Sequence, residues 1–420
     1  MADPNEVLGP ILSAQSMQLD LPPSCVEFCP AFPSYFLVGT YNLQKDESSA
    51  TAKIQGHDDE PRAAGTVKPQ TRNGSVITFR LTDKTIIHIQ TESLPSAILD
   101  LHFNPNYGYQ DCCGAVSSTA TLAMFRFCPD QDQPLRHIRT MDMAIMAGSA
   151  GDAESEPKDL LFLSFCWHPS RSDTIAVTTS TGNVHLVSLG SIEGGSWVLN
   201  PEPVITHTLE AWCVAVSPTL KVPGQDGGDS FTVFSGGDDS ALRYRSFARA
   251  TDLRTTDFIS TPGDITVAIK RQHDAGVTAI LPLAMQETGS EFVLTGSYDD
   301  HIRLFAVGPA IYGPSVTRML AERNLGGGVW RLKLVTVKNK PGNGTWAATI
   351  LASCMHGGAR IVELVKTEAG DYQFHVVGSF VEHKSMNYGS DFQPGETGGL
   401  TVVSTSFYDK LLCLWEFPLR

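Results

Sequence analysis

The sequence predicts an all-β chain folded as a seven-bladed β-propeller, and three observations lead to this prediction. A pattern typical of β-hairpins recurs along the chain. A separate strand candidate precedes each copy of this pattern. Stretches with the helical period of 3.6 residues are scarce, whereas strand-and-turn spacing dominates.

The hairpin pattern places an aspartate in a polar turn six residues before an aromatic residue. Its clearest copies are FTVFSGGDDSALRYRSF (231–247), FVLTGSYDDHIRLFAV (292–307) and VVSTSFYDKLLCLWEF (402–417), with the pairs Asp238/Tyr244, Asp299/Phe305 and Asp409/Trp415. Alternating apolar residues on both sides of such a turn predict two antiparallel strands. We expect the three aspartates to tighten their turns through local backbone hydrogen bonds.

Three looser copies turn at Thr119, Thr181 and His356, so that successive turns lie 53 to 62 residues apart. This spacing fits propeller blades that carry loop insertions. The preceding strand candidates are 96–105, 161–169, 210–218, 275–283, 327–335 and 386–394. Residues 26–43 together with 75–81 supply one more unit, which makes seven.

The seven units form a single propeller domain over residues 1–420, of the WD-repeat type. Their approximate bounds are 24–81, 96–127, 160–190, 210–247, 274–307, 326–363 and 382–417. The last unit is one strand short of a four-stranded blade. The segment SAQSMQLDLP (13–22) can supply that outer strand, which closes the ring and removes an exposed sheet edge.

Composition excludes several classes of function. The 420 residues carry a net charge of −14 without a block of Lys or Arg, so we expect no direct nucleic-acid binding. No secretory signal and no apolar run long enough for a membrane span is visible, which favours a cytoplasmic protein without membrane attachment. The nine cysteines include no CxxC pair, so neither a disulfide framework nor a zinc site is indicated. We expect no metal and no cofactor.

Propeller topology assigns each loop to one side of the ring, because the innermost strand of each blade runs from the top face to the bottom face. The long polar insertion 44–74 falls on the top face, between the second and third strands of the first blade. It is either a solvated loop or a lid or docking arm beside a top-face site.

His356 is the most unusual residue of the predicted top face, because it occupies the turn position where related units have aspartate. Gly357 follows it, and the run Gly326, Gly327 and Gly328 precedes the innermost strand of the same unit. Glycines allow backbone amides to face a ligand. An imidazole beside free amides suits ester hydrolysis, which needs a general base and donors for an oxyanion.

Other residues near this turn have structural alternatives. A histidine before an innermost strand commonly braces a blade by bonding a turn aspartate, which we expect for His273 with Asp299. His383 with Asp409 is either a second brace or part of the site. His102 is expected to be a packing or turn residue.

Five motifs in order resemble those of the diphthine methyl ester hydrolases, WD-repeat proteins of diphthamide biosynthesis. They are VEFCP with FLVGTYNL, GGGVWRLK, ASCMHGG, EHKSMNYGSDF and STSFYDKLLCLWEF, and they run from about residue 24 to residue 417. One departure follows GGGVWRLK, where LVTVKNK replaces a tryptophan–histidine–proline ending. This departure lies at the lower end of a strand, away from the predicted site.

The resemblance implies hydrolysis of the methyl ester of diphthine methyl ester on translation elongation factor 2, giving diphthine. The protein would then be a carboxylic ester hydrolase with elongation factor 2 as its protein substrate. The diphthamide-synthesis enzymes are possible further partners. The alternative is a non-catalytic adaptor that binds elongation factor 2 or those enzymes, since propellers are usually interaction platforms.

For the hydrolase, we expect a general base, a nucleophile and a binding surface on the top face. The base is His356 or His383, oriented by Glu382 or Asp409, and it activates water or Ser385. Cys354 is a rival nucleophile, although its place within a strand favours a buried thiol. The substrate-binding residues are Gly326, Gly327, Gly328 and Gly357 for the oxyanion, Trp330 and Tyr388 as walls, and Arg331 for a carboxylate.

Overall fold

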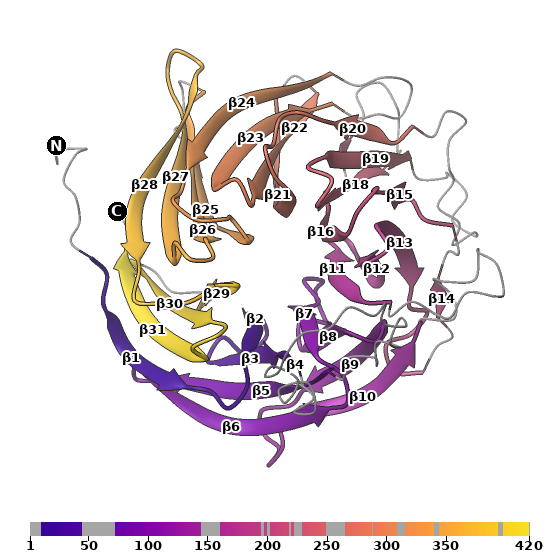
Figure 1. The fold of residues 1–420 in the computed structure, drawn as a ribbon, viewed down its shortest axis with the longest axis vertical. Helices are drawn as coiled ribbons and strands as arrows, with labels where there is room; N and C mark the ends of the chain where they lie inside the picture. Colours follow the sequence, from indigo (N-terminus) through magenta and orange to yellow (C-terminus); the bar gives the residue numbers. More distant parts are fainter. Residues whose placement is uncertain are drawn as a thin grey trace, which may run out of the picture.

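The computed structural model shows a ring of seven antiparallel sheets, which confirms the predicted seven-bladed β-propeller (Figure 1). The structure describes residues 10–43, 72–143, 160–194, 197–199, 202–217, 220–221, 229–248, 265–287, 289–308, 316–339, 344–393 and 398–419. Most of the insertion predicted at 44–74 lies outside the described residues, and residues 72–74 begin strand β5.

The first four blades follow one another along the chain. Blade 1 contains β2 (Pro23–Phe28), β3 (Tyr35–Thr40), β4 (Asn42–Leu43), β5 (Arg72–Thr82) and β6 (Thr85–Leu94). Blade 2 contains β7 (Ile98–Phe103), β8 (Cys112–Ser117), β9 (Thr121–Phe127) and β10 (Leu135–Asp142). Blade 3 contains β11 (Phe162–His168), β12 (Arg171–Thr179), β13 (Asn183–Ser188), β14 (Val198–Leu199) and β15 (Ile205–Thr206). Blade 4 contains β16 (Ala211–Val216), β17 (Leu220–Lys221), β18 (Asp229–Gly237), β19 (Leu242–Ala248) and β20 (Val267–Ile269).

The remaining three blades complete the ring. Blade 5 contains β21 (Val277–Glu287), β22 (Ser290–Ser297), β23 (His301–Val307) and β24 (Thr317–Asn324). Blade 6 contains β25 (Arg331–Asn339), β26 (Trp346–Ser353), β27 (Ala359–Lys366) and β28 (Tyr372–Phe380). Blade 7 contains β29 (Gly389–Phe392), β30 (Gly399–Ser406), β31 (Leu411–Pro418) and β1 (Ser13–Gln18).

Strand β1 closes the ring, as the sequence predicted. It pairs antiparallel with β31, from Ser13 opposite Trp415 to Gln18 opposite Leu411, and it lies on the outer side of blade 7 (Figure 1). The outer edge of β31 is therefore paired within the chain rather than open to another molecule.

Neighbouring blades pack closely because small residues stand where strands meet. A Cβ atom on Gly236 would lie 2.5 Å from Cγ1 of Val277, and one on Gly296 would lie 2.5 Å from Cγ1 of Val329. Each valine comes from the next blade, at the upper end of its innermost strand. Any side chain at these two glycines would push the adjacent blades apart.

Buried histidines brace three blades through a hydroxyl of the second strand. Nε2 of His273 lies 2.8 Å from Thr295 Oγ1 in blade 5. In blade 4, Nε2 of His207 lies 3.0 Å from Ser235 Oγ. The predicted bracing role of His273 is confirmed, but its partner is a threonine. Asp299 instead accepts from the backbone amide of Asp274 at 2.9 Å.

The turn aspartate of blade 4 is Asp239, not Asp238 as the sequence spacing suggested. Asp239 bonds Nδ1 of His207 at 2.9 Å and pairs with Arg243 at 2.7 Å. The corresponding pair in blade 5 is Asp299 with Arg303 at 2.9 Å. The six-residue spacing to Tyr244 selected the wrong one of two consecutive aspartates, which leaves Asp238 available for another role.

Candidate functional site

The predicted glycine run and the His356 turn lie against each other on the top face of blade 6. A Cβ atom on Gly327 would lie 2.2 Å from the Cys354 carbonyl oxygen and 2.6 Å from the Gly357 nitrogen. Only glycine allows the two loops to approach this closely. The structure therefore brings together residues that are about 30 positions apart in sequence, as expected.

The His356 side chain is exposed in the turn between β26 and β27. Gly358, which completes this turn, has a φ of 77°, a backbone conformation that favours glycine. The imidazole makes no hydrogen bond or ion pair with any residue that the structure describes. Its nitrogen atoms are therefore available to hydrogen-bond to solvent or to a bound ligand.

The backbone amides around His356 differ in what they can offer to an oxyanion. The Gly357 amide donates to the Cys354 carbonyl at 2.6 Å, and the Gly326 amide donates to Oδ1 of Asn324 at 2.9 Å. Both are occupied, contrary to their expected role. The amides of Gly327 and Gly328 have no acceptor among the described residues, so these two remain the candidate donors.

Aromatic side chains cover the top face beside this turn. The rings of Trp330 and Tyr388, both expected to form walls, have centroids 4.9 Å apart. Trp212 and Tyr298, which the sequence did not single out, lie 5.6 and 6.0 Å from the Trp330 ring. All four side chains are half-buried and belong to four successive blades.

The structure favours the bracing alternative for His383. This histidine is buried, its Nε2 lies 2.8 Å from Ser404 Oγ, and the same hydroxyl accepts from Nε1 of Trp415 at 2.9 Å. Burial lowers the pKa of His383 to about 4. A buried, neutral imidazole bonded on the core side is poorly placed to accept a proton from substrate.

Glu382, Ser385 and Asp409 hold blade 7 together and orient no imidazole through a hydrogen bond. Glu382 accepts from Ser13 Oγ of β1 at 2.5 Å. Ser385 Oγ accepts from the backbone amides of Met386 at 2.6 Å and Tyr408 at 2.8 Å. Asp409 accepts from the Lys384 amide at 3.2 Å and from the Ser406 hydroxyl.

Arg331 points into the centre of the ring rather than to the top face. Its guanidinium lies 2.7 Å from Oδ1 of Asp100, a fully buried carboxylate on the innermost strand of blade 2. Blades 6 and 2 are thus joined across the axis. Arg331 is committed to this ion pair, so the expected contact with a substrate carboxylate is not available to it.

This ion pair belongs to a larger charged cluster, which we call the axial network and define as Glu27, Asp100, His102, Arg331, Lys333 and Asp391. Nδ1 of His102 lies 2.7 Å from Glu27, and its Nε2 lies 3.2 Å from Asp100. Lys333 lies 3.2 Å from Glu27 and 2.9 Å from Asp391. His102 is therefore an ion-pair residue and not the packing or turn residue that the sequence suggested.

Burial and mutual attraction compete in setting the charges of the axial network. Burial would lower the pKa of His102, but Asp100 and Glu27 raise it to about 9. Burial would raise the pKa of Glu27, but Lys333 and His102 hold it at about 2. At neutral pH His102 is therefore a cation held between two carboxylates.

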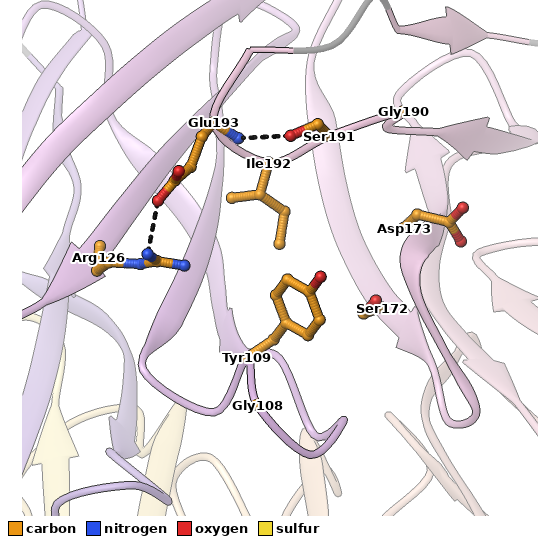
Figure 2. Close-up of a pocket in the computed structure, with 9 residues that line it drawn as sticks. All are labelled: Gly108, Tyr109, Arg126, Ser172, Asp173, Gly190, Ser191, Ile192 and Glu193. Atoms are coloured by element: carbon orange, nitrogen blue, oxygen red, sulfur yellow. Dashed lines mark hydrogen bonds and ion pairs between the residues drawn. The ribbon is translucent and has the colours of Figure 1, made fainter.

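A cavity on the opposite, bottom face lies between blades 2 and 3 and has a volume of about 410 Å³ (Figure 2). Its lining includes Tyr109, Arg126 and Glu193. Arg126 is paired with Glu193 at 2.6 Å and with Asp111 at 3.4 Å. The charges at this cavity are thus satisfied internally, and none of the predicted site residues lies there.

No group of three or more His, Cys, Asp or Glu side chains in the parts of the chain that the structure describes could hold a metal ion. Within the same ranges, no helix has the length and hydropathy to cross a membrane.

The fold and its bracing histidines define a seven-bladed β-propeller of the WD-repeat type. A chain in the crystal structure of a mitotic checkpoint complex shares the fold, with a TM-score of 0.54 and 10% identity over 100% of this chain and 96% of that one. No protein-family model matches the sequence.

The sequence is similar over nearly its full length to proteins named diphthine methyltransferase. The Saccharomyces cerevisiae protein is 26% identical, with 95% of this chain and 97% of that protein covered. The Homo sapiens protein is 25% identical, with 90% of this chain and 74% of that protein covered. A diphthine methyltransferase homolog of Dictyostelium discoideum is 24% identical over 94% of this chain.

Proposed function

We propose that this chain acts in diphthamide biosynthesis and hydrolyses the methyl ester of diphthine methyl ester on translation elongation factor 2, in the cytoplasm. Similarity to proteins named for diphthine supports the pathway. The observation that carries the ester hydrolysis is the contact between the exposed His356 turn and the free amides of Gly327 and Gly328. The relatives are named methyltransferases. The experiment must therefore distinguish removal of a methyl group from its addition.

In this proposal, His356 acts as the general base towards water. The imidazole accepts a proton while the water oxygen bonds to the ester carbonyl carbon. The negative charge that develops on the carbonyl oxygen is held by the amides of Gly327 and Gly328. When the tetrahedral intermediate collapses, the C–OCH₃ bond breaks and the methoxy group takes the proton from His356. The products are a carboxylic acid and methanol.

Water is favoured over either side-chain nucleophile. Ser385 Oγ already accepts two backbone hydrogen bonds, which reduces the lone-pair density available for attack. Cys354 is buried, and burial raises the pKa of its thiol to about 12, so its reactive thiolate form is scarce at neutral pH.

The experiment measures methyl loss from a defined substrate. Purified protein is incubated with elongation factor 2 carrying diphthine methyl ester, in buffer without any methyl donor. Intact-mass spectrometry is expected to show loss of one methyl group, and a methanol assay is expected to show an equal amount of methanol. Unchanged substrate mass at stoichiometric protein would reject the hydrolase. A gain of methyl groups only after adding S-adenosylmethionine would instead support methyl transfer.

A non-catalytic adaptor remains the second candidate, because no carboxylate of the described residues orients the His356 ring. An adaptor would bind elongation factor 2 or the diphthamide-synthesis enzymes without changing the substrate mass. The same preparation therefore tests both candidates, provided that binding to elongation factor 2 is measured alongside methyl loss.

A further inference from the structure

Four aromatic residues of the top face gather around Trp330, and we call them the aromatic cluster and define it as Trp212, Tyr298, Trp330 and Tyr388. Trp330 is its centre, and its ring is inclined by 58° to Trp212, 44° to Tyr298 and 50° to Tyr388. Rings inclined in this way present several π faces and edges instead of one flat stack. All four rings remain partly accessible to solvent.

An acidic side chain stands beside the cluster. A Cβ atom on Gly276 would lie 2.9 Å from Oδ1 of Asp238 and 3.0 Å from Cδ2 of Tyr298, so the carboxylate and the ring both lie against Gly276. Asp238 is half-buried and pairs with no Lys, Arg or His of the described residues. The structural work of the turn is done by Asp239 instead.

The electrostatic surroundings of Asp238 are those of a site for positive charge. Burial raises the pKa of Asp238, the indole N–H of Trp212 lowers it, and the nearby Glu210 and Asp239 raise it further. Asp239 is already neutralised by Arg243. A cation beside Asp238 would give this carboxylate the opposite charge that no Lys, Arg or His of the described residues supplies.

We propose that the aromatic cluster and Asp238 form a binding site for a methylated, quaternary ammonium group. Aromatic rings attract cations through their negative π faces, and quaternary ammonium ions suit such sites because they need no hydrogen-bond acceptor. Asp238 adds a full negative charge at the edge of the rings. A neutral ligand would leave Asp238 without a cationic partner.

This site lies next to the proposed hydrolytic residues and, in its role for the substrate, rests on the proposed function. Gly328 is two residues before Trp330, and a Cβ atom on it would lie 3.5 Å from Tyr298 Cα. Diphthine is itself a trimethylammonium compound, with the ammonium and the carboxyl group on the same carbon atom. The site would therefore hold the ammonium while the ester carbonyl faces the amides of Gly327 and Gly328.

The test uses two small probes that differ by one atom. Choline carries a trimethylammonium group, and 3,3-dimethylbutan-1-ol is its neutral isostere, with carbon in place of nitrogen. Each is titrated into the full-length protein, and binding is followed by tryptophan fluorescence and by ligand-observed NMR. We expect choline to bind about tenfold more tightly than the isostere, because cation–π attraction to half-buried rings and the charge of Asp238 together amount to about the free energy of a tenfold change.

Two variants and a control locate the binding site. Asp238→Asn should weaken choline binding by about tenfold and leave the isostere unchanged, because it removes charge but not shape. Trp330→Phe should weaken choline by a few-fold while retaining a ring. Asp274→Asn removes an exposed top-face carboxylate outside the cluster and should change neither affinity. Thermal unfolding of each variant verifies that it is folded.

The outcomes separate this proposal from the hydrolase. Equal affinities of wild-type protein for the two probes, or equal choline binding by wild type and Asp238→Asn, would overturn the ammonium site. If choline is preferred but methyl loss from elongation factor 2 is absent, the ammonium site stands and the hydrolase fails. If methyl loss occurs without any preference for choline, the hydrolase stands and the ammonium site fails.

Discussion

Replacing His102 with glutamine is expected to remove a pH-dependent part of the free energy of unfolding. His102 lies between Glu27 and Asp100, with only 24% of its side chain exposed. Glutamine keeps a polar side chain but cannot take up a proton. Glu27 retains Lys333 as a partner and Asp100 retains Arg331, so neither carboxylate becomes an isolated buried charge.

The size of the effect follows from the shift in the pKa of His102, from its usual 6.5 to about 9. Each pKa unit corresponds to about 1.4 kcal/mol, so the protonated ring stabilises the folded state by about 3 kcal/mol at most. Because the pKa is raised on folding, this contribution is complete below about pH 6.5. It is lost as the pH rises through about 9.

The assay is urea unfolding of wild type and His102→Gln at several pH values between 6 and 10. Burial raises the pKa of Glu291 to about 8, so ionisation of this residue also lowers the unfolding free energy of both proteins as the pH rises towards 8. The difference between the two unfolding free energies is therefore the quantity to follow. It should shrink by about 3 kcal/mol from pH 6 to pH 10. A difference that stays constant across this range would refute a charged His102.

Three further predictions follow from the site and the blades. His356→Ala should reduce the rate of methyl loss by about 10²-fold or more without lowering the thermal midpoint. His375 is an exposed histidine on the outer strand of blade 6, and His375→Ala should leave the rate unchanged. Equal rates for the two variants would remove His356 from the mechanism. His383→Ala should lower the unfolding free energy by about 2 kcal/mol, because the buried Ser404 hydroxyl loses one of its two partners and keeps only Trp415. The rate per folded molecule should persist, and a stable but inactive variant would restore His383 as a base. Arg331→Met should lower the unfolding free energy by about 3 kcal/mol in urea unfolding, because the buried Asp100 then keeps His102 as its cationic partner but loses the closer one. A cost below about 1 kcal/mol would argue against a buried Arg331–Asp100 ion pair.

The repeat was predictable because a β-hairpin is a local structure. Alternating apolar residues and a polar turn lie within about 17 consecutive residues, so one copy can be compared directly with the next. Ring closure by residues 13–18 was predictable for a different reason. A blade that lacks its outer strand leaves an edge for which the remaining segment of the chain is the natural partner.

The site was predictable only in part. The position of His356 on the top face followed from topology, and so did its proximity to Gly327. The partner of Glu382 did not, because Ser13 is 369 residues away in sequence. Asp238 and Asp239 are adjacent, so a shift of one residue in the alignment of the repeats decides which of them is the turn aspartate. The hydrogen bond between His207 and Asp239 shows that it is Asp239, and this bond is not visible in the sequence.

The axial network shows a signal that sequence reasoning could have used. Asp100 and His102 are two residues apart on a strand, as are Arg331 and Lys333, so each pair faces the same side of its sheet. Charged residues repeated in this way on predicted innermost strands point to the axis. Which blades they join, however, depends on side chains that meet across the ring, and no local pattern contains that information.

The pairing of β1 with β31 has a consequence for how the protein folds during its synthesis. The two strands join residues 13–18 to residues 411–415, so nearly the whole chain must be translated before they can meet. At 5–20 residues per second, β1 waits roughly 20 to 80 s on the ribosome for its partner. Every newly made molecule therefore passes through an open-ring stage with an unpaired first strand, and molecular chaperones have their opportunity to act during that interval.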